Sequence, residues 1–212
     1  MKRLICISYI FLAFFCLKIN AKDTWTWKNP IPQGNDLKDI HIFDANNAIV
    51  VGMAGTIMKT TDGGANWNIQ YRVDSSYNDL NSVFFIDNNT GWAVGGGLGV
   101  YQGGDVILKT TDGGTNWTVQ SQGNFLDLYD VYFFDADTGW ACGQSGTLIK
   151  TINGGATWSG LTTGTTNSLR KIQFTDSVTG WVSGLSGTIF KTENGGTNWT
   201  DISYATAISF YS

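Results

Sequence analysis

The residues best suited to acid–base chemistry in this sequence are aspartates in its middle third. They are Asp74, Asp79, Asp105, Asp127 and Asp130. Two carboxylates held at a fixed separation can hydrolyse a glycosidic bond, one as the acid and the other as the base or nucleophile. Spacing along the chain does not pair any two of these residues, and surface carboxylates are commonly only solvated charges. The sequence therefore offers carboxylates but no defined catalytic pair.

Other chemically versatile side chains are rare. His41 is the only histidine, and in the repeats described below its position is taken by Phe84, Tyr132 and Gln173, so we expect a packed or rim histidine. Without a cluster of His and Cys, we predict no metal site and no cofactor, and a Ser-His-Asp triad would have to use His41. Cys142 is the only cysteine after residue 21, so no intramolecular disulfide is expected there, and we predict a small buried residue.

The first 21 residues have the features of a signal peptide. Lys2 and Arg3 precede an apolar run at 4–17, which is short for a membrane span, and Ala21 ends a plausible cleavage site. We therefore expect export to the periplasm, the cell surface or the medium. An uncleaved anchor is the alternative. After cleavage no membrane span is predicted, because no later stretch approaches the roughly 20 apolar residues that a helix needs.

The charge balance is acidic. The chain has 13 basic and 17 acidic residues, and loss of Lys2, Arg3 and Lys18 with the signal peptide leaves 10 basic residues and a net charge of −7. An acidic surface repels phosphate groups, so neither nucleic acid nor an anionic membrane is expected as a partner.

An eight-residue phrase organises the rest of the chain. It occurs at residues 60–67 (TTDGGANW), 110–117 (TTDGGTNW), 151–158 (TINGGATW) and 192–199 (TENGGTNW). Asp-Gly or Asn-Gly between apolar runs predicts a hairpin turn in which both residues can adopt positive φ, and the Asp or Asn side chain can bond nearby amides. We therefore assign structural roles to one acidic or amide residue and one tryptophan in each copy: Asp62, Trp67, Asp112, Trp117, Asn153, Trp158, Asn194 and Trp199.

Around this phrase the copies align as four short strands, here A to D. An apolar strand A is followed by a Gly-Trp-led strand B, a strand C that ends at the turn and a strand D that begins at the tryptophan. A repeat of about 40 residues built in this way predicts one β-propeller blade per copy. The predicted fold is all-β, with four four-stranded antiparallel blades at about 37–70, 80–120, 128–161 and 169–202 within a repeat region at 22–212.

Strand alternation predicts which connections share a face. The B–C and D–A connections should lie at one end of each blade, with the A–B turns and the Asp-Gly turns at the other. The variable B–C and D–A connections carry aromatic and arginine side chains, which are enriched in binding hot spots. The predicted contact residues on that face are Tyr71, Arg72, Tyr77, Tyr101 and Phe125.

The repeat resembles the photosystem II stability/assembly factor-like family of Asp-box (bacterial neuraminidase repeat) β-propellers. The resemblance covers residues 37–202 and depends on Phe-x-Asp, Gly-Trp and Asp-Gly-Gly-x-x-Trp elements that recur in order. It implies that the Asp box is a fold element, and that the protein binds other proteins and assists assembly of a membrane complex. The photosynthetic members resemble one another in an arginine-rich patch, which the two arginines remaining here, Arg72 and Arg170, are too few to rebuild.

The resemblance also implies a carbohydrate-active alternative, because sialidases and some glucan hydrolases are Asp-box propellers. Sialidases of this kind need three arginines, more than remain after the signal peptide. We therefore predict an exported binding scaffold, not an enzyme, with a protein partner. A glycoside hydrolase or glycan-binding module is the alternative.

The ends of the chain predict an incomplete ring. A lone outer strand at 25–32 precedes the four repeats, and residues 207–212 resemble the start of a further strand A. We expect four blades in an open arc, with apolar blade faces that neighbours must cover and a tendency to self-associate. A closed four-blade ring is the alternative.

Overall fold

The computed structural model describes residues 34–71, 78–97 and 104–203. The lone strand predicted at 25–32 and the fifth-blade start at 207–212 lie outside these residues. So do the side chain of Tyr71 and all of Arg72, Tyr77 and Tyr101. No helix of the described part is long and apolar enough to cross a membrane.

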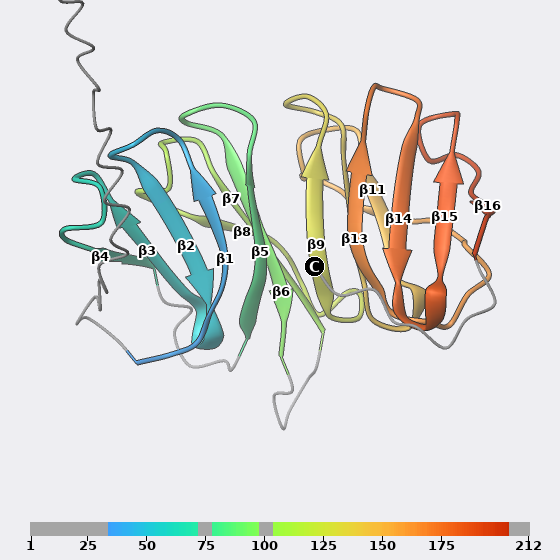
Figure 1. The fold of residues 1–212 in the computed structure, drawn as a ribbon, viewed down its shortest axis with the longest axis horizontal. Helices are drawn as coiled ribbons and strands as arrows, with labels where there is room; N and C mark the ends of the chain where they lie inside the picture. The colour runs from blue at the N-terminus through green and yellow to red at the C-terminus, as the bar shows by residue number, and fades with distance from the viewer. Residues whose placement is uncertain (1–33, 72–77, 98–103, 204–212) are drawn as a thin grey trace, which may run out of the picture.

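The described residues form sixteen strands in four antiparallel sheets, each with its strands in sequence order (Figure 1). The first sheet has β1 (Leu37–Ile42), β2 (Ala48–Gly52), β3 (Thr56–Thr60) and β4 (Asn68–Tyr71). The second has β5 (Asp79–Phe85), β6 (Gly91–Gly96), β7 (Asp105–Thr110) and β8 (Thr118–Gln122). The third has β9 (Leu128–Phe133), β10 (Gly139–Gly143), β11 (Leu148–Thr151) and β12 (Ser159–Gly160). The fourth has β13 (Leu169–Phe174), β14 (Gly180–Gly184), β15 (Ile189–Thr192) and β16 (Thr200–Asp201).

These sheets are the four blades of an open arc, which confirms the predicted fold class. The inner strands pack in order, β1 against β5, β5 against β9 and β9 against β13. The first and last blades extend to opposite sides, and all four inner strands face the concave side of the arc (Figure 1). The short 3₁₀ turns η1 (Met53–Gly55), η2 (Gln144–Gly146) and η3 (Leu185–Gly187) connect the second and third strands of three blades.

The core lies between blades and repeats with the sequence. Between the second and third blades, Trp92 stacks on Phe133 with ring centroids 3.5 Å apart. Trp140 stacks in the same way on Phe174, at 3.8 Å, between the third and fourth. In the second half of β5, β9 and β13, side chains alternate between the two sheet faces, so every second residue packs against the preceding blade.

The Asp-Gly turns have a regular hydrogen-bond pattern. In the second blade, Asp112 Oδ1 accepts bonds from Thr110 Oγ1 and the Asn116 amide, both at 2.9 Å, and Thr110 Oγ1 accepts one from the Gly114 amide at 3.0 Å. The predicted backbone conformation of the Asp-Gly pair was wrong in one respect, because the aspartate does not have a positive φ. Instead, both following glycines have positive φ, 67° at Gly113 and 81° at Gly114.

The two ends of the blades are as strand alternation predicts. At one end, each A–B turn accepts a hydrogen bond from an Asp-box glycine, as in Gly113 N to Asn89 O at 2.9 Å. At the other, each short B–C turn donates to the residue that precedes the inner strand, as in Gln144 N to Asp127 O at 2.8 Å. The variable connections therefore share one end with the starts of the inner strands.

Candidate functional site

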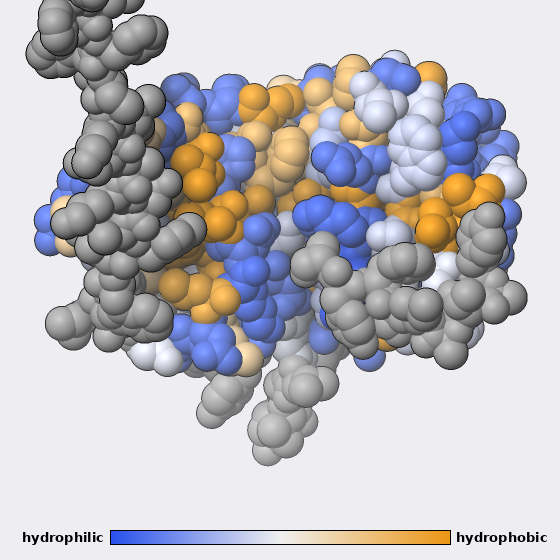
Figure 2. Space-filling view, viewed as in Figure 1, coloured by the Kyte–Doolittle hydropathy of each residue, from blue (hydrophilic) through white to orange (hydrophobic). Residues whose placement is uncertain are grey.

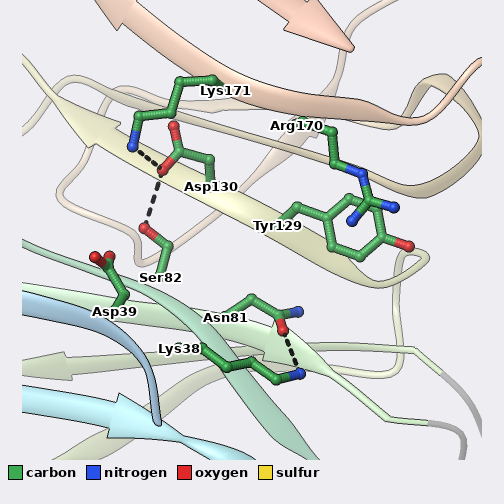
Figure 3. Close-up of a pocket in the computed structure, with 8 residues that line it drawn as sticks. All are labelled: Lys38, Asp39, Asn81, Ser82, Tyr129, Asp130, Arg170 and Lys171. Carbon is green, nitrogen blue, oxygen red and sulfur yellow. Dashed lines mark hydrogen bonds and ion pairs between the residues drawn. The ribbon is translucent and has the colours of Figure 1, made fainter. Parts of the chain in front are cut away.

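A cavity of about 490 Å³ lies at the centre of the arc, at the starts of the inner strands (Figure 3). Each of the four blades contributes two consecutive residues to its lining. These are Lys38 and Asp39, Asn81 and Ser82, Tyr129 and Asp130, and Arg170 and Lys171. A volume of this size is typical of ligand pockets.

A β-bulge in each inner strand explains why neighbouring residues line the same cavity. Normally, successive side chains of a strand point to opposite faces. In the third blade, however, Leu128 pairs with Gly143 and Asp130 pairs with Cys142, which leaves Tyr129 as the extra residue. The same irregularity leaves Lys38, Asn81 and Arg170 as the extra residues of the other blades. An extra residue re-aims its side chain, and bulges are common beside functional sites.

A glycine opposite each bulge makes room for it. A Cβ on Gly143 would lie 2.0 Å from the Asp127 carbonyl oxygen, and the equivalent Cβ on Gly95 would lie 1.8 Å from the Asp79 carbonyl oxygen. Both obstacles are backbone atoms, so they could not move aside without distorting the strand. Every blade has such a glycine, three residues after Trp92, Trp140 and Trp181 and after Ile49 in the first blade. This glycine is therefore needed to shape the cavity wall.

Asp130 is the most deeply buried charged group of the cavity. Its carboxylate accepts hydrogen bonds from Ser82 Oγ at 3.0 Å, Lys171 Nζ at 3.1 Å and the Ile172 amide at 2.8 Å. Burial raises its pKa, which the Lys171 charge and the hydrogen bonds only partly oppose. Burial also acts to lower the pKa of Lys171, but the Asp130 carboxylate outweighs this effect and raises it. Asp130 therefore serves as an acceptor that ties three blades together.

The other carboxylate of the lining has a similar role. Asp39 Oδ2 accepts a 2.9 Å hydrogen bond from the Val83 amide of the second blade, and its Oδ1 accepts one from the Ile40 amide at 2.9 Å. Both lining carboxylates thus bond backbone amides, which leaves neither as an unattached acid or base.

Arg170 has unused hydrogen-bonding capacity. Its guanidinium carbon lies 4.1 Å from the centroid of the Tyr129 ring, and the side chains face each other in the cavity (Figure 3). The Arg170 Nε atom is buried and has no hydrogen-bond partner among the described residues. A buried guanidinium donor without an acceptor carries a cost that a bound carboxylate would remove. This side chain is therefore the strongest candidate for a ligand contact.

The third cation of the lining is already paired. Lys38 Nζ lies 2.9 Å from Asp79 Oδ2 and 3.0 Å from Asn81 Oδ1. Near this pair, burial raises the pKa of Asp127, the Asp79 carboxylate raises it further, and Lys38 opposes the shift. The rim of the cavity therefore holds two carboxylates, Asp79 and Asp127, and one lysine, Lys38, whose positive charge balances only one of them.

Of the residues predicted from the sequence, the structure places Asp130 in the cavity wall and Asp79 and Asp127 near its rim. Asp105 lies elsewhere, beside a second cavity of about 330 Å³, where its Oδ1 accepts bonds from the Asn124 and Phe125 amides at 2.7 and 2.8 Å. The Phe125 side chain is partly buried against the core between the second and third blades. Its contact role and those of Tyr71, Arg72, Tyr77 and Tyr101 stay predictions. Asp74 lies outside the described residues.

His41 is a packed residue, as expected. Its ring centroid lies 4.8 Å from that of Phe43 and 5.1 Å from that of Phe85, and burial lowers its pKa despite the nearby Asp39 charge. Cys142 is fully buried, and burial raises the pKa of its thiol. Within the described residues, no group of three His, Cys, Asp or Glu could hold a metal ion.

Sequence reasoning missed most of the cavity, although a signal for it was present. Each inner strand has a leucine as its first or second residue, followed by two residues that are mostly polar or charged, as in Leu37-Lys38-Asp39 and Leu169-Arg170-Lys171. In a regular strand with one buried face, a polar residue is followed by a buried apolar one. Two polar residues in succession after the leucine therefore indicate a bulge.

Comparison with known proteins agrees with this architecture. The family model described as "Photosynthesis system II assembly factor YCF48" matches residues 17–124 and 123–209. The chain belongs to the YCF48 family. A structure of YCF48 bound to D1 peptide is 23% identical with a TM-score of 0.63, over 84% of this chain and 56% of that one. YCF48 from Cyanidioschyzon merolae is 21% identical with a TM-score of 0.60, over 85% and 60%.

Enzymes also share the fold. A GH74 enzyme from Niastella koreensis is 19% identical with a TM-score of 0.57, over 79% of this chain and 30% of the enzyme. These likenesses show the propeller fold alone. The chain spans little more than half the length of the two YCF48 structures. The comparison with curated proteins gave no match.

Proposed function

We propose that this protein is an exported binding scaffold that holds a peptide segment of a protein partner in its central cavity. The observation that carries the proposal is Arg170, whose buried Nε lacks an acceptor and whose guanidinium is supported by the Tyr129 ring. Arginine presents a rigid fork of donors that matches a carboxylate. The ligand group is therefore an acidic side chain or the C-terminal carboxylate of the peptide.

Two further observations support a protein partner. The chain belongs to the YCF48 family, and one YCF48 structure holds a D1 peptide. In addition, the cavity lies at the blade end that carries the variable connections, so a peptide entering it would also meet those loops. An assembly role for the whole protein is part of this proposal.

Peptide titration tests the cavity. The full chain is titrated with synthetic peptides made both with free C-termini and as C-terminal amides, and with acidic residues replaced by amides. Arg170→Gln should weaken binding by about tenfold or more, since it removes charge-assisted hydrogen bonds. The comparison variant is Arg72→Gln, which removes the same charge from a predicted contact residue of a variable connection and should weaken binding less than Arg170→Gln does. Loss of binding in Arg72→Gln alone would place the site on the loops instead.

A carbohydrate-active role is the second candidate, and Asp127 favours it. Its raised pKa beside Asp79 is what the acid of a carboxylate pair requires. Incubation of the chain with soluble glucans tests this role, with Asp127→Asn compared with Asp176→Asn at the opposite blade end. Glucan turnover lost only in Asp127→Asn, together with no peptide binding, would replace the scaffold proposal.

Export belongs to the proposal and has its own test. Expression of the full chain in a bacterial host should give a product that begins at Lys22 in the exported fraction. N-terminal sequencing measures this directly. Retention of residues 1–21 at the membrane would indicate the anchor instead.

A further inference from the structure

The first blade exposes apolar residues that are buried in every other blade. Its inner strand β1 presents Leu37, Ile40 and Ile42, which are 43%, 50% and 65% exposed. Their counterparts in the other inner strands are no more than 6% exposed, because a preceding blade covers them. Those counterparts are Leu80, Val83, Phe85, Leu128, Val131, Phe133, Leu169, Ile172 and Phe174. Figure 2 shows hydrophobic surface over the region of β1 in Figure 1.

The fourth blade exposes the opposite half of the same interface. Trp181 and Ile189 are partly exposed, whereas their counterparts are fully buried or nearly so. The counterparts are Ile49, Trp92 and Trp140 for the tryptophan and Ile57, Ile107 and Leu148 for the isoleucine. We refer to Leu37, Ile40 and Ile42 as the first-blade face, and to Trp181, Ile189 and Lys191 as the fourth-blade face.

A lysine bond accompanies each interface inside the chain. Lys59, Lys109 and Lys150 each donate from Nζ to a glycine carbonyl in the next Asp box, at 2.8, 2.8 and 2.7 Å. The acceptors are Gly113, Gly154 and Gly195. Their equivalent in the fourth-blade face is Lys191, which instead pairs with Glu193 of its own blade. The equivalent acceptor in the first blade is the carbonyl of Gly63.

The two faces therefore match in both apolar and polar groups, in a pairing that the chain already makes three times. We propose that a second copy of this chain covers them, with the fourth-blade face of each copy against the first-blade face of the other. Because the two end blades extend to opposite sides of the arc (Figure 1), two head-to-tail contacts about a twofold axis close one ring. Such a ring has eight blades, within the range known for propellers.

The oligomeric state tests this pairing. Sedimentation equilibrium should give twice the protomer mass, which is 23.1 kDa for the chain with residues 1–21 retained. Ile42→Asp places a charge in the first-blade face and should raise the dissociation constant of the dimer at least tenfold. The matched control is Ile152→Asp, because Ile152 is 72% exposed on an Asp-box turn outside both faces, and it should remain dimeric.

Mixing variants distinguishes head-to-tail pairing from any other contact. Trp181→Asp, which damages only the fourth-blade face, should also be monomeric alone. Mixed with Ile42→Asp, it should form a heterodimer, because one intact face of each kind remains. Circular dichroism verifies that each variant is folded. The proposal would be overturned by a monomeric wild-type chain, by a dimer unaffected by Ile42→Asp, or by a mixture that stays monomeric.

Discussion

The Asp130 carboxylate of the third blade accepts a 2.8 Å hydrogen bond from the backbone amide of Ile172 in the fourth. Asp39 makes the same bond to the Val83 amide across the first and second blades, at 2.9 Å. Inner strands of neighbouring blades do not pair as a sheet, so these carboxylates supply acceptors that the sheets lack. Charged residues of the cavity wall thus hold the arc together as well as shaping the cavity.

Asp130→Ala should lower the free energy of unfolding by about 1–3 kcal/mol, because it leaves the buried Ile172 amide without an acceptor. Urea unfolding followed by tryptophan fluorescence measures this change. Asp130→Asn keeps an oxygen for the Ile172 amide and should lose less. Equal losses in the two variants would show that the negative charge beside Lys171, and not the hydrogen bond to the amide, carries the effect.

Gly143→Ala should also destabilise the protein, by about 1–3 kcal/mol, since the added Cβ would lie 2.0 Å from the Asp127 carbonyl oxygen. The distortion would fall on the bulge at Tyr129, so peptide binding should weaken in the folded protein as well. Gly160→Ala is the matched control, because a Cβ at Gly160 would meet nothing within 4 Å. Its stability should lie within about 0.5 kcal/mol of the wild type. A stable Gly143→Ala variant would contradict the role of glycine opposite the bulge.

Much of this fold follows from the sequence, for physical reasons that differ between elements. The repeated Asp-Gly-Gly turn and the Gly-Trp strand are local signals, so blade number and strand order could be predicted from them. The bulges at Tyr129 and Arg170 depend on the register between two strands, so the only signal for them in the sequence is the pair of mostly polar residues after each leucine. The stacking of Arg170 on Tyr129 joins two blades 41 residues apart and has no local signal. The predicted contact residues came from loop composition, which does not report the inward-facing wall.

The Asp box gives the stability of the protein a specific dependence on pH. Hydrogen bonds from the Asn116 amide and side chain lower the pKa of Asp112 from 3.8 to about 2. Because the folded pKa lies below the unfolded value, the contribution of this group is fully present above pH 3.8 and is lost as the pH falls through about 2. The melting temperature of Asp112→Asn, which keeps the turn but does not titrate there, should therefore approach that of the wild type over this window. Asp112→Ala should melt at a lower temperature than either at pH 7. An unchanged difference between wild type and Asp112→Asn from pH 7 to pH 2 would contradict this role.

The Tyr129 ring should matter for binding through the position of Arg170. The guanidinium carbon lies 4.1 Å from the ring centroid, and a cation over an aromatic ring gains about 0.5–1 kcal/mol at a partly exposed site. Tyr129→Leu should therefore weaken peptide binding by roughly twofold to fivefold. Tyr129→Phe keeps the ring and should bind like the wild type, which separates the ring face from the hydroxyl. Fluorescence anisotropy with one labelled peptide compares the three proteins, and their melting temperatures serve as the control for folding. If Tyr129→Leu binds as tightly as Tyr129→Phe, the ring does not position Arg170, and the arginine must reach its ligand without that support.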